Sequence, residues 1–474
     1  MKLLKNMFYN VSYQLLTLLL PLITVPYVSR VLTPEGVGIN AYTNSIVMYF
    51  ILIGGLGIGL YGNREIAYVQ RNKKQRSIIF WELAFLKFAS IGIASLLFLI
   101  FILSVDRWRT YYLLQGIVLL AGAFDISWYF MGVEDFRKIV LRNTIVKVVI
   151  AVLTFVIIKS KNDLGLYISL ISLSTLLGNL TVWPFLRTEI QKVKFSELNI
   201  LRHLRPTVIL LMPQITMQIY LSLNKTILGL LSTVTEVGYY DQSDKIVRIL
   251  FTVVAAIGGV FLPRLASLFS QGNKEEAKNL VLKLIDVSNA ISILLMAGLM
   301  GVSHSFAIFF FGKPYAPVGN LMFLQSLMII FISYANALGT QYLLASRRNK
   351  AYTISAFVGL GVNLISNFTL IPLFGVVGAI IATVLTEVAV TSFQIWSLRD
   401  VFTIKELTFG LPKYVLAGLL TFGLVNVLDR FLADNLISYA VIGLSGGLLY
   451  LLGLIVLKAP ISGMLQGFLK GRKK

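Results

Sequence analysis

The sequence has 474 residues and a net charge of +21, yet only 13% of its residues are charged and 57% are hydrophobic. Soluble domains carry about 25% charged residues, so this composition excludes an ordinary water-soluble globule. The chain has no cysteine and two histidines, which excludes disulfides, thiolate chemistry and histidine-rich metal sites. It also has no Walker A motif and no dinucleotide-binding glycine motif, so we predict a membrane protein with no bound cofactor.

Long apolar segments follow one another along the chain. A transmembrane helix needs about 20 mostly apolar residues. The runs of this kind lie at residues 8–31, 38–61, 79–103, 110–132, 143–159, 164–186, 206–231, 238–262, 280–303, 317–341, 352–372, 375–397, 411–428 and 436–457. They predict an all-α integral membrane protein of about 14 transmembrane helices. The first run contains Arg30 and is followed by further runs, so we interpret it as a helix rather than a signal peptide.

The basic residues are distributed unevenly between the predicted loops. An even number of spans places both termini on one side of the membrane. If that side is the cytoplasm, the outer segments carry only Arg107, Arg109, Lys159, Lys161, Lys313 and Arg430. Most other Lys and Arg residues then lie in cytoplasmic loops, as the positive-inside rule predicts. The high net charge is therefore explained by orientation, without a nucleic-acid partner.

A weak internal repeat links the two halves of the chain. The residues Thr33, Val37, Gly38, Ile46, Val47 and Arg64 recur at the same spacing as Thr233, Val237, Gly238, Ile246, Val247 and Arg264. Repeats often frame the substrate site of a transporter. We predict two pseudo-symmetric six-helix bundles, at residues 1–204 and 205–400. Two further transmembrane helices and a basic cytoplasmic tail follow at residues 401–474.

Several charges fall inside the predicted spans. The basic ones are Arg30, Lys87, Lys147, Lys225, Lys245 and Arg248, and the deepest acidic ones are Asp125 and Glu387. A charge near the bilayer centre costs about 3 kcal/mol, so these residues are expected to face a cavity or a charged partner. Because Arg and Lys recognise phosphate well, the basic excess favours an anionic cargo over an organic cation.

The spacing of polar residues points to three helices. Asp241, Asp244, Lys245 and Arg248 stand at i, i+3, i+4 and i+7, which places them on one helical face. Similar polar lines run through Gln214, Gln218, Ser222 and Lys225 and through Asn10, Gln14, Thr17 and Thr24. These lines predict a hydrated cavity between the two lobes.

The candidate site collects these residues. Its predicted cationic cavity comprises Arg30, Lys87, Lys225, Lys245 and Arg248. The residues predicted to line the cavity with polar groups or to couple transport are Gln14, Asn44, Asp125, Gln218, Asp241, Asp244 and Glu387. Arg64 and Arg264 are predicted to lie at its cytoplasmic mouth.

A purely structural interpretation also stays open. Asp241 and Lys245 alone form a good i,i+4 ion pair. Internal pairing of this kind would leave Arg248 and Lys225 without obvious partners. Asp125 would then neutralise a neighbouring lysine rather than carry protons, and Lys147 would reach the cytoplasmic interface.

Four segments carry a resemblance to a known family. They are Gly62-Asn63-Arg64-Glu65-Ile66-Ala67, Trp128 to Phe136 with Arg142, Val237-Gly238-Tyr239-Tyr240 through Pro263-Arg264, and Leu338-Gly339-Thr340-Gln341 through Arg348. In this order, on a chain with this many spans, they resemble Wzx-type polysaccharide repeat-unit flippases of the multidrug/oligosaccharidyl-lipid/polysaccharide (MOP) exporter superfamily.

The resemblance implies a MATE-like fold and a transporter rather than an enzyme. Its cargo would be an undecaprenyl-diphosphate-linked oligosaccharide repeat unit for capsule or O-antigen, flipped by alternating access in the bacterial plasma membrane. Transport would couple to a proton gradient, a sodium gradient or the membrane potential. Further partners would be membrane lipids and the polysaccharide polymerase machinery. A lipid II flippase, a multidrug antiporter and, from another class, an integral-membrane glycosyltransferase or polymerase remain alternatives.

Overall fold

The described part of the chain is helical throughout. The computed structural model describes residues 2–463, and all side chains of this range except those of residues 2–18, 212–214, 216, 217 and 219–221. No strand occurs in this range. Chain contacts divide the protein into two compact units, Met1–Gly229 and Leu230–Lys474, and each is described by itself.

The first unit contains nine α-helices. They are α1 (Lys2–Gly55), α2 (Ile58–Tyr68), α3 (Lys73–Leu103), α4 (Arg109–Ala123), α5 (Ser127–Gly132), α6 (Phe136–Ile157), α7 (Leu164–Leu180), α8 (Leu186–Glu189) and α9 (Leu204–Leu231). Helix α1 packs against α3, α4 and α6, and α4 packs against α7. Short 3-10 turns join α6 to α7 and lead from α8 to α9, the last of them at Ile200–His203.

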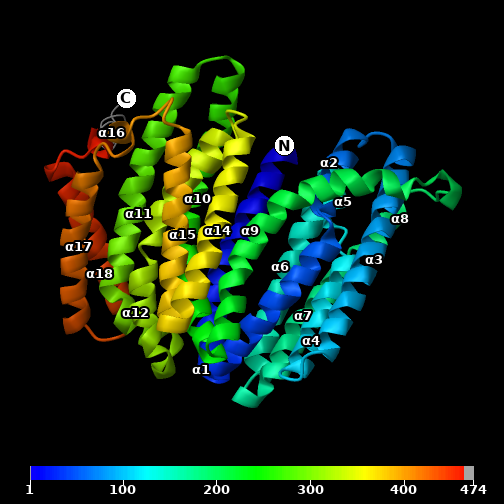
Figure 1. The fold of residues 1–474 in the computed structure, drawn as a ribbon, viewed down its shortest axis with the longest axis horizontal. Helices are drawn as coiled ribbons and strands as arrows, with labels where there is room; N and C mark the ends of the chain where they lie inside the picture. Colours follow the sequence, from blue (N-terminus) through cyan, green and yellow to red (C-terminus); the bar gives the residue numbers. More distant parts are fainter. Residues whose placement is uncertain (1, 464–474) are drawn as a thin grey trace. The chain divides into compact units, whose positions relative to one another are not determined.

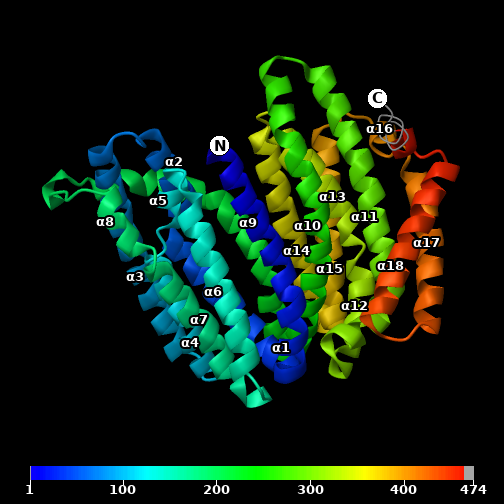
Figure 2. The ribbon, with the colours of Figure 1, turned by 180° about the vertical axis from the view of Figure 1, so that it is seen from behind.

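The second unit contains the remaining helices (Figures 1 and 2). They are α10 (Val234–Ser270), α11 (Lys274–Phe311), α12 (Ala316–Gln325), α13 (Met328–Ala335), α14 (Asn349–Phe374), α15 (Val376–Ser397), α16 (Ile404–Leu407), α17 (Leu411–Phe431) and α18 (Leu436–Val456). A π-helix (Asn336–Leu343) continues α13. The two C-terminal helices α17 and α18 pack together and against α11, as Figure 1 shows in orange and red.

The hydrophobic lengths of these helices fit an integral membrane protein. Eleven helices in the described residues are long and apolar enough to cross a membrane. A twelfth span results if the pair Lys313–Gln325 and Met328–Leu343, bent by 47°, is one broken span. The all-α membrane fold is confirmed. The predicted count of about 14 spans is compatible with this result and stays a prediction.

Helix α1 is two helices joined at a kink. Thr33 has φ 62° and ψ 169°, outside the helical range, and Pro34 follows it. Proline disfavours a helical conformation at the residue before it, which explains why the break falls here. The helix continues through Pro21 and Pro26, although proline removes a hydrogen bond from the helical ladder. Two predicted spans, 8–31 and 38–61, therefore appear as one bent element.

Helix α9 belongs to the first unit, whereas the sequence places the lobe boundary at residue 204. Thr226 lies 2.9 Å from the hydroxyls of both Ser45 and Tyr49 on α1. Gly57, before α2, has φ +71°, and a Cβ there would stand 2.8 Å from the carbonyl oxygen of Thr207. Such an approach requires glycine. The symmetry of the two predicted six-helix bundles stays a prediction.

Candidate functional site

Helix α10 carries the predicted charged face. Lys245 Nζ lies 2.5 Å from Asp241 Oδ2, and Arg248 Nε donates to Asp244 Oδ2 at 2.7 Å. Both pairs have i,i+4 spacing, which brings side chains together on one helix face. The expectation that internal pairing would leave Arg248 without a partner was wrong, because Asp244 lies one turn away and is available to it.

A buried glutamine on α12 completes this cluster, and sequence reasoning missed it. Gln325 is fully buried. Its Nε2 donates to Asp244 Oδ1 at 3.0 Å, and its Oε1 accepts from Ser243 Oγ at 2.6 Å. The available signal was an amide in the middle of the apolar stretch Leu321–Ile332. Gln325 therefore fixes the Asp244 carboxylate from a second helix while Arg248 holds its other oxygen.

Lys87 and Asp125 form the corresponding polar centre of the first unit. Lys87 is 6% exposed and donates from Nζ to the backbone oxygen of Asp125 at 2.6 Å, with the carboxylate at 4.0 Å. The Asp125 carboxylate accepts from the backbone and the hydroxyl of Ser127 at 3.0 and 2.6 Å. Asp125 thus lies beside the lysine, as the structural interpretation expected, and its bonds to Ser127 hold the turn between α4 and α5.

The hydrogen bonds around Asp125 and Ser127 extend to α6 and α7. Arg142 donates to Ser127 Oγ at 3.3 Å and to Asn179 Oδ1 at 3.1 Å. Asn179 Nδ2 in turn donates to the backbone oxygen of Ala121 at 2.8 Å. Arg142 belongs to one of the four family-like segments, and in the structure it cross-links three helices.

The remaining predicted residues are spread over both units. Asn44 donates to Gln115 on α4 at 3.2 Å. Arg64 pairs with Glu65 at 3.0 Å, and Arg264 pairs with Glu276 at 3.0 Å. The other residues are Arg30, which is exposed, Lys225 and Gln218, which are half-buried, and Glu387, which is buried. Arg30, Lys225 and Glu387 each take part in a further interaction, whereas the side chain of Gln14 lies outside the described residues.

A second ionic cluster in the first unit was not anticipated. Glu82 on α3 is 1% exposed, and its Oε2 lies 2.8 Å from His203 Nε2 and 2.5 Å from Arg202. Its Oε1 accepts from the backbone N–H of Asn199 at 2.6 Å. The Tyr61 hydroxyl lies 2.8 Å from His203 Nδ1. This cluster ties α2 and α3 to the segment that precedes α9.

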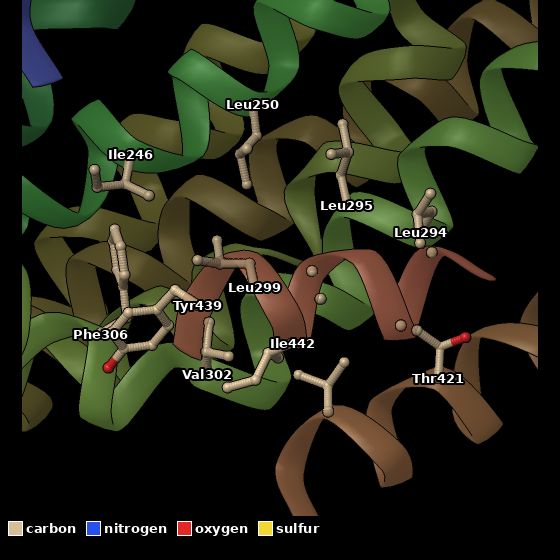
Figure 3. A pocket seen from close by; sticks show the side chains of 15 residues that line it. Ile246, Leu250, Leu294, Leu295, Leu299, Val302, Phe306, Thr421, Tyr439 and Ile442 are labelled. Carbon is tan, nitrogen blue, oxygen red and sulfur yellow. The ribbon is translucent and has the colours of Figure 1, made fainter. Parts of the chain in front are cut away.

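An apolar pocket of about 390 Å³ lies within the second unit. Figure 3 shows its side chains, with Phe306 and Tyr439 at one end and Thr421 toward the other. Helices α10, α11, α17 and α18 line it, and four of its lining residues are glycines. Ile246 and Leu250 of this pocket belong to α10, the helix of the charged face.

Two of the family-like segments pack on each other. A Cβ at Gly62 would stand 2.5 Å from the Trp128 ring. A Cβ at Gly132 would stand 2.7 Å from the Cβ of Ile66. The contacting residues are 66 positions apart in the sequence, and they form a close-packed interface between α2 and α5. Their composition therefore reflects packing rather than a catalytic site.

The long apolar helices and the paired charges inside them define a polytopic membrane protein. A family model described as "Polysaccharide biosynthesis protein" matches residues 3–269. The chain belongs to this family, and its identification as a Wzx-type flippase of the MOP superfamily is confirmed.

Similar proteins agree with this membership. A protein of Escherichia coli (strain K12) named "Putative O-antigen transporter" is 25% identical over 409 residues, covering 84% of this chain and 96% of that protein. A protein of Shigella dysenteriae with the same name is 25% identical over 398 residues, covering 80% and 96%. These names confirm a transporter rather than an enzyme.

The fold has counterparts among solved structures. The lipid II flippase MurJ in an inward closed conformation aligns with a TM-score of 0.70 at 16% identity, covering 96% of this chain and all of that chain. At this identity the likeness shows the fold alone, and it confirms the predicted MOP-type architecture.

Proposed function

We propose that this protein flips an undecaprenyl-diphosphate-linked oligosaccharide repeat unit from the cytoplasmic to the outer leaflet, for capsule or O-antigen synthesis. Family membership supports a lipid-linked oligosaccharide as the cargo. The observation that carries the site is the arrangement of charge on α10. It joins two cations and two carboxylates in a helix whose other faces are largely apolar.

The two ion pairs of α10 are exposed unequally. The side chain of Lys245 is 42% exposed and that of Asp241 is 5% exposed. For Arg248 and Asp244 the values are 29% and 8%. The cations are therefore accessible, while the carboxylates lie beneath them and hold them in place. A guanidinium and an ammonium presented in this way suit a diphosphate, because charge-assisted hydrogen bonds to phosphate are strong.

The apolar pocket supports a lipid-linked cargo. Ile246 and Leu250 line it one and two positions beyond the cations Lys245 and Arg248 on the same helix. Ile246 and Leu250 point to the side of α10 away from Lys245 and Arg248, so the polyprenyl chain of a diphosphate at the cations would pass around the helix to reach this pocket. We propose that part of the polyprenyl chain occupies this pocket, because its lining is almost entirely apolar and suits hydrocarbon.

Orientation and coupling complete the proposal. The uneven distribution of Lys and Arg supports a bacterial inner membrane location with both termini in the cytoplasm. We propose alternating access coupled to a proton or sodium gradient or to the potential. Moving one charge through 100 mV yields about 2.3 kcal/mol, so an inside-negative potential would favour export of an anionic cargo. The polysaccharide polymerase machinery would take up the flipped product.

The decisive experiment follows the lipid-linked intermediate in cells. The gene is deleted or depleted, and undecaprenyl-linked glycans on the cytoplasmic leaflet are measured. Complementation uses wild type, Lys245→Ala, Arg248→Ala and the exposed control Lys274→Ala, all at equal membrane levels. We expect a repeat-unit intermediate to accumulate and to be cleared by wild type and by the control, but not by the α10 variants.

Other outcomes would change the conclusion in different ways. If the repeat-unit intermediate accumulates in the deletion strain and both α10 variants clear it, the flippase function stands and the α10 site is refuted. Accumulation of lipid II with wall failure, or drug sensitivity without any lipid-linked glycan, would assign another cargo. Orientation is tested separately, because the chain has no cysteine. A membrane-impermeant thiol reagent applied from outside should label Lys313→Cys but not Lys274→Cys.

A further inference from the structure

A basic pocket lies at one end of the α14–α15 hairpin, away from the groups assigned to transport. The two helices run side by side in the second unit (Figure 1). The pocket has a volume of about 420 Å³ and is formed where α14 begins and α15 ends. Its lining is Arg348, Lys350, Ala351, Ile354, Phe393, Trp396, Ser397 and Arg399. Because both helices have the length and hydropathy of membrane spans, this end lies at a membrane surface.

The charges of the pocket are strongly one-sided. Lys350 and Arg399 are exposed, and neither forms an ion pair within the described residues. The Arg399 guanidinium lies 4.7 Å from the centre of the Trp396 ring. Arg348 is held by two hydrogen bonds to Asp400, of 2.8 and 2.5 Å, and this pairing holds the pKa of the Asp400 carboxyl below its usual range. Arg348 is thus neutralised and fixed, whereas Lys350 and Arg399, the latter also attracted by Asp400, expose their charged groups to an anion.

A second pocket in the same unit differs in the charges of its lining. That pocket, of about 600 Å³, contains Lys283 and Lys405 but also the carboxylates of Asp286 and Glu406. Its lining therefore holds as many carboxylates as lysines and carries no excess of positive charge. No carboxylate lines the pocket at the α14–α15 end.

The apolar side chains beside this pocket face outward. Trp396 is 55% exposed, Ile354 is 38% exposed, and Phe357, one turn further along α14, is 55% exposed. Tryptophan with Lys or Arg at the end of a span is typical of the membrane–water interface. A ligand with a negatively charged head and a hydrocarbon chain would satisfy both parts of this surface.

We propose that this pocket binds the phosphodiester headgroup of an anionic membrane phospholipid, with an acyl chain along Ile354 and Phe357. Basic pockets between transmembrane helices bind such headgroups through charge and hydrogen bonds. The pocket is too small to enclose an oligosaccharide together with its carrier, which favours a phospholipid over the transported substrate. The site is independent of the proposed cargo.

The test measures lipid preference in the full-length purified protein. Trp396 is one of five tryptophans, so its fluorescence is isolated by comparison with Trp396→Phe. Protein in nanodiscs of phosphatidylcholine is titrated with phosphatidylglycerol carrying brominated acyl chains, and the quenching of Trp396 is compared with that by brominated phosphatidylcholine. The variants are Lys350→Gln/Arg399→Gln, the charge-retaining Arg399→Lys, and the exposed control pair Lys192→Gln/Lys274→Gln.

The expected result is preferential quenching by the anionic lipid. The preference should fall about 30-fold in Lys350→Gln/Arg399→Gln, since each basic residue near an anionic surface contributes a factor of roughly five. It should persist in Arg399→Lys and in the control pair. Equal quenching by both lipids, or an unchanged preference in the double variant, would overturn the proposal. So would displacement of the phospholipid by an equimolar polyprenyl diphosphate, which would assign the pocket to the substrate, or by millimolar inorganic phosphate alone.

Discussion

Replacing Glu82 with alanine tests whether the buried ionic cluster of the first unit stabilises the fold. The Glu82 carboxylate is almost completely buried and holds the N–H of Asn199, the His203 ring and the Arg202 guanidinium. Alanine removes every one of these contacts at once. It leaves the buried imidazole of His203 and the backbone N–H of Asn199 without this acceptor.

The expected cost follows from these contacts. Leaving a buried donor without its acceptor costs about 1–3 kcal/mol, and truncating a buried side chain adds the cost of the cavity left behind. We therefore expect Glu82→Ala to lower the free energy of unfolding by about 2–4 kcal/mol. Glu82→Gln retains the volume and an acceptor for Asn199 and should cost about 1–3 kcal/mol. The matched control is Glu65→Gln, whose partner Arg64 is 47% exposed; it should cost at most about 1 kcal/mol.

The assay is equilibrium unfolding of the purified protein in mild detergent, followed by tryptophan fluorescence, with size-exclusion profiles recorded for each variant. A double-mutant cycle of Glu82→Gln with His203→Gln should give a coupling energy of about 0.5–3 kcal/mol, as expected for residues in direct contact. If Glu82→Ala is no more destabilising than Glu65→Gln, or if the coupling energy is zero, the cluster does not stabilise this unit and the argument from burial is refuted.

Three further predictions use the same unfolding assay. Gly57→Ala should destabilise by about 1–3 kcal/mol, because alanine is strained at φ +71° and its Cβ would meet α9, whereas Gly59→Ala, in open space on α2, should be neutral or slightly stabilising. Gln325→Leu should cost about 1–3 kcal/mol, since a buried carboxylate oxygen and a buried hydroxyl on α10 lose their partner. The pairing with Arg348 lowers the pKa of Asp400 in the folded protein, so its stabilisation is present above the unfolded pKa of about 3.9 and is lost as the pH falls through the lower folded value. Asp400→Asn should therefore be less stable than wild type at pH 7, and the difference should vanish at strongly acidic pH; a difference independent of pH would contradict this assignment.

The positions of the predicted site residues show where local sequence is informative. The i,i+4 pairs of α10 follow directly from helical spacing, so their geometry was predictable once the run was recognised as a helix. The exposure of their cations and the burial of their carboxylates were not, because these depend on which helices pack against each side. Gln325 joins Asp244 from a helix 81 positions away, and nothing in the spacing of either segment specifies that contact.

The sequence alone determined the all-α membrane fold, because this depends on composition and on hydrophobic runs within single helices. Only the tertiary structure paired Lys87 with Asp125, 38 positions apart, and Glu82 with His203, 121 positions apart. It also placed Gly57 at a close approach between the start of α2 and α9. These contacts join helices that are distant in the chain. A buried charge inside a membrane must have a partner, but the sequence does not say which one, since that choice depends on how the helices pack.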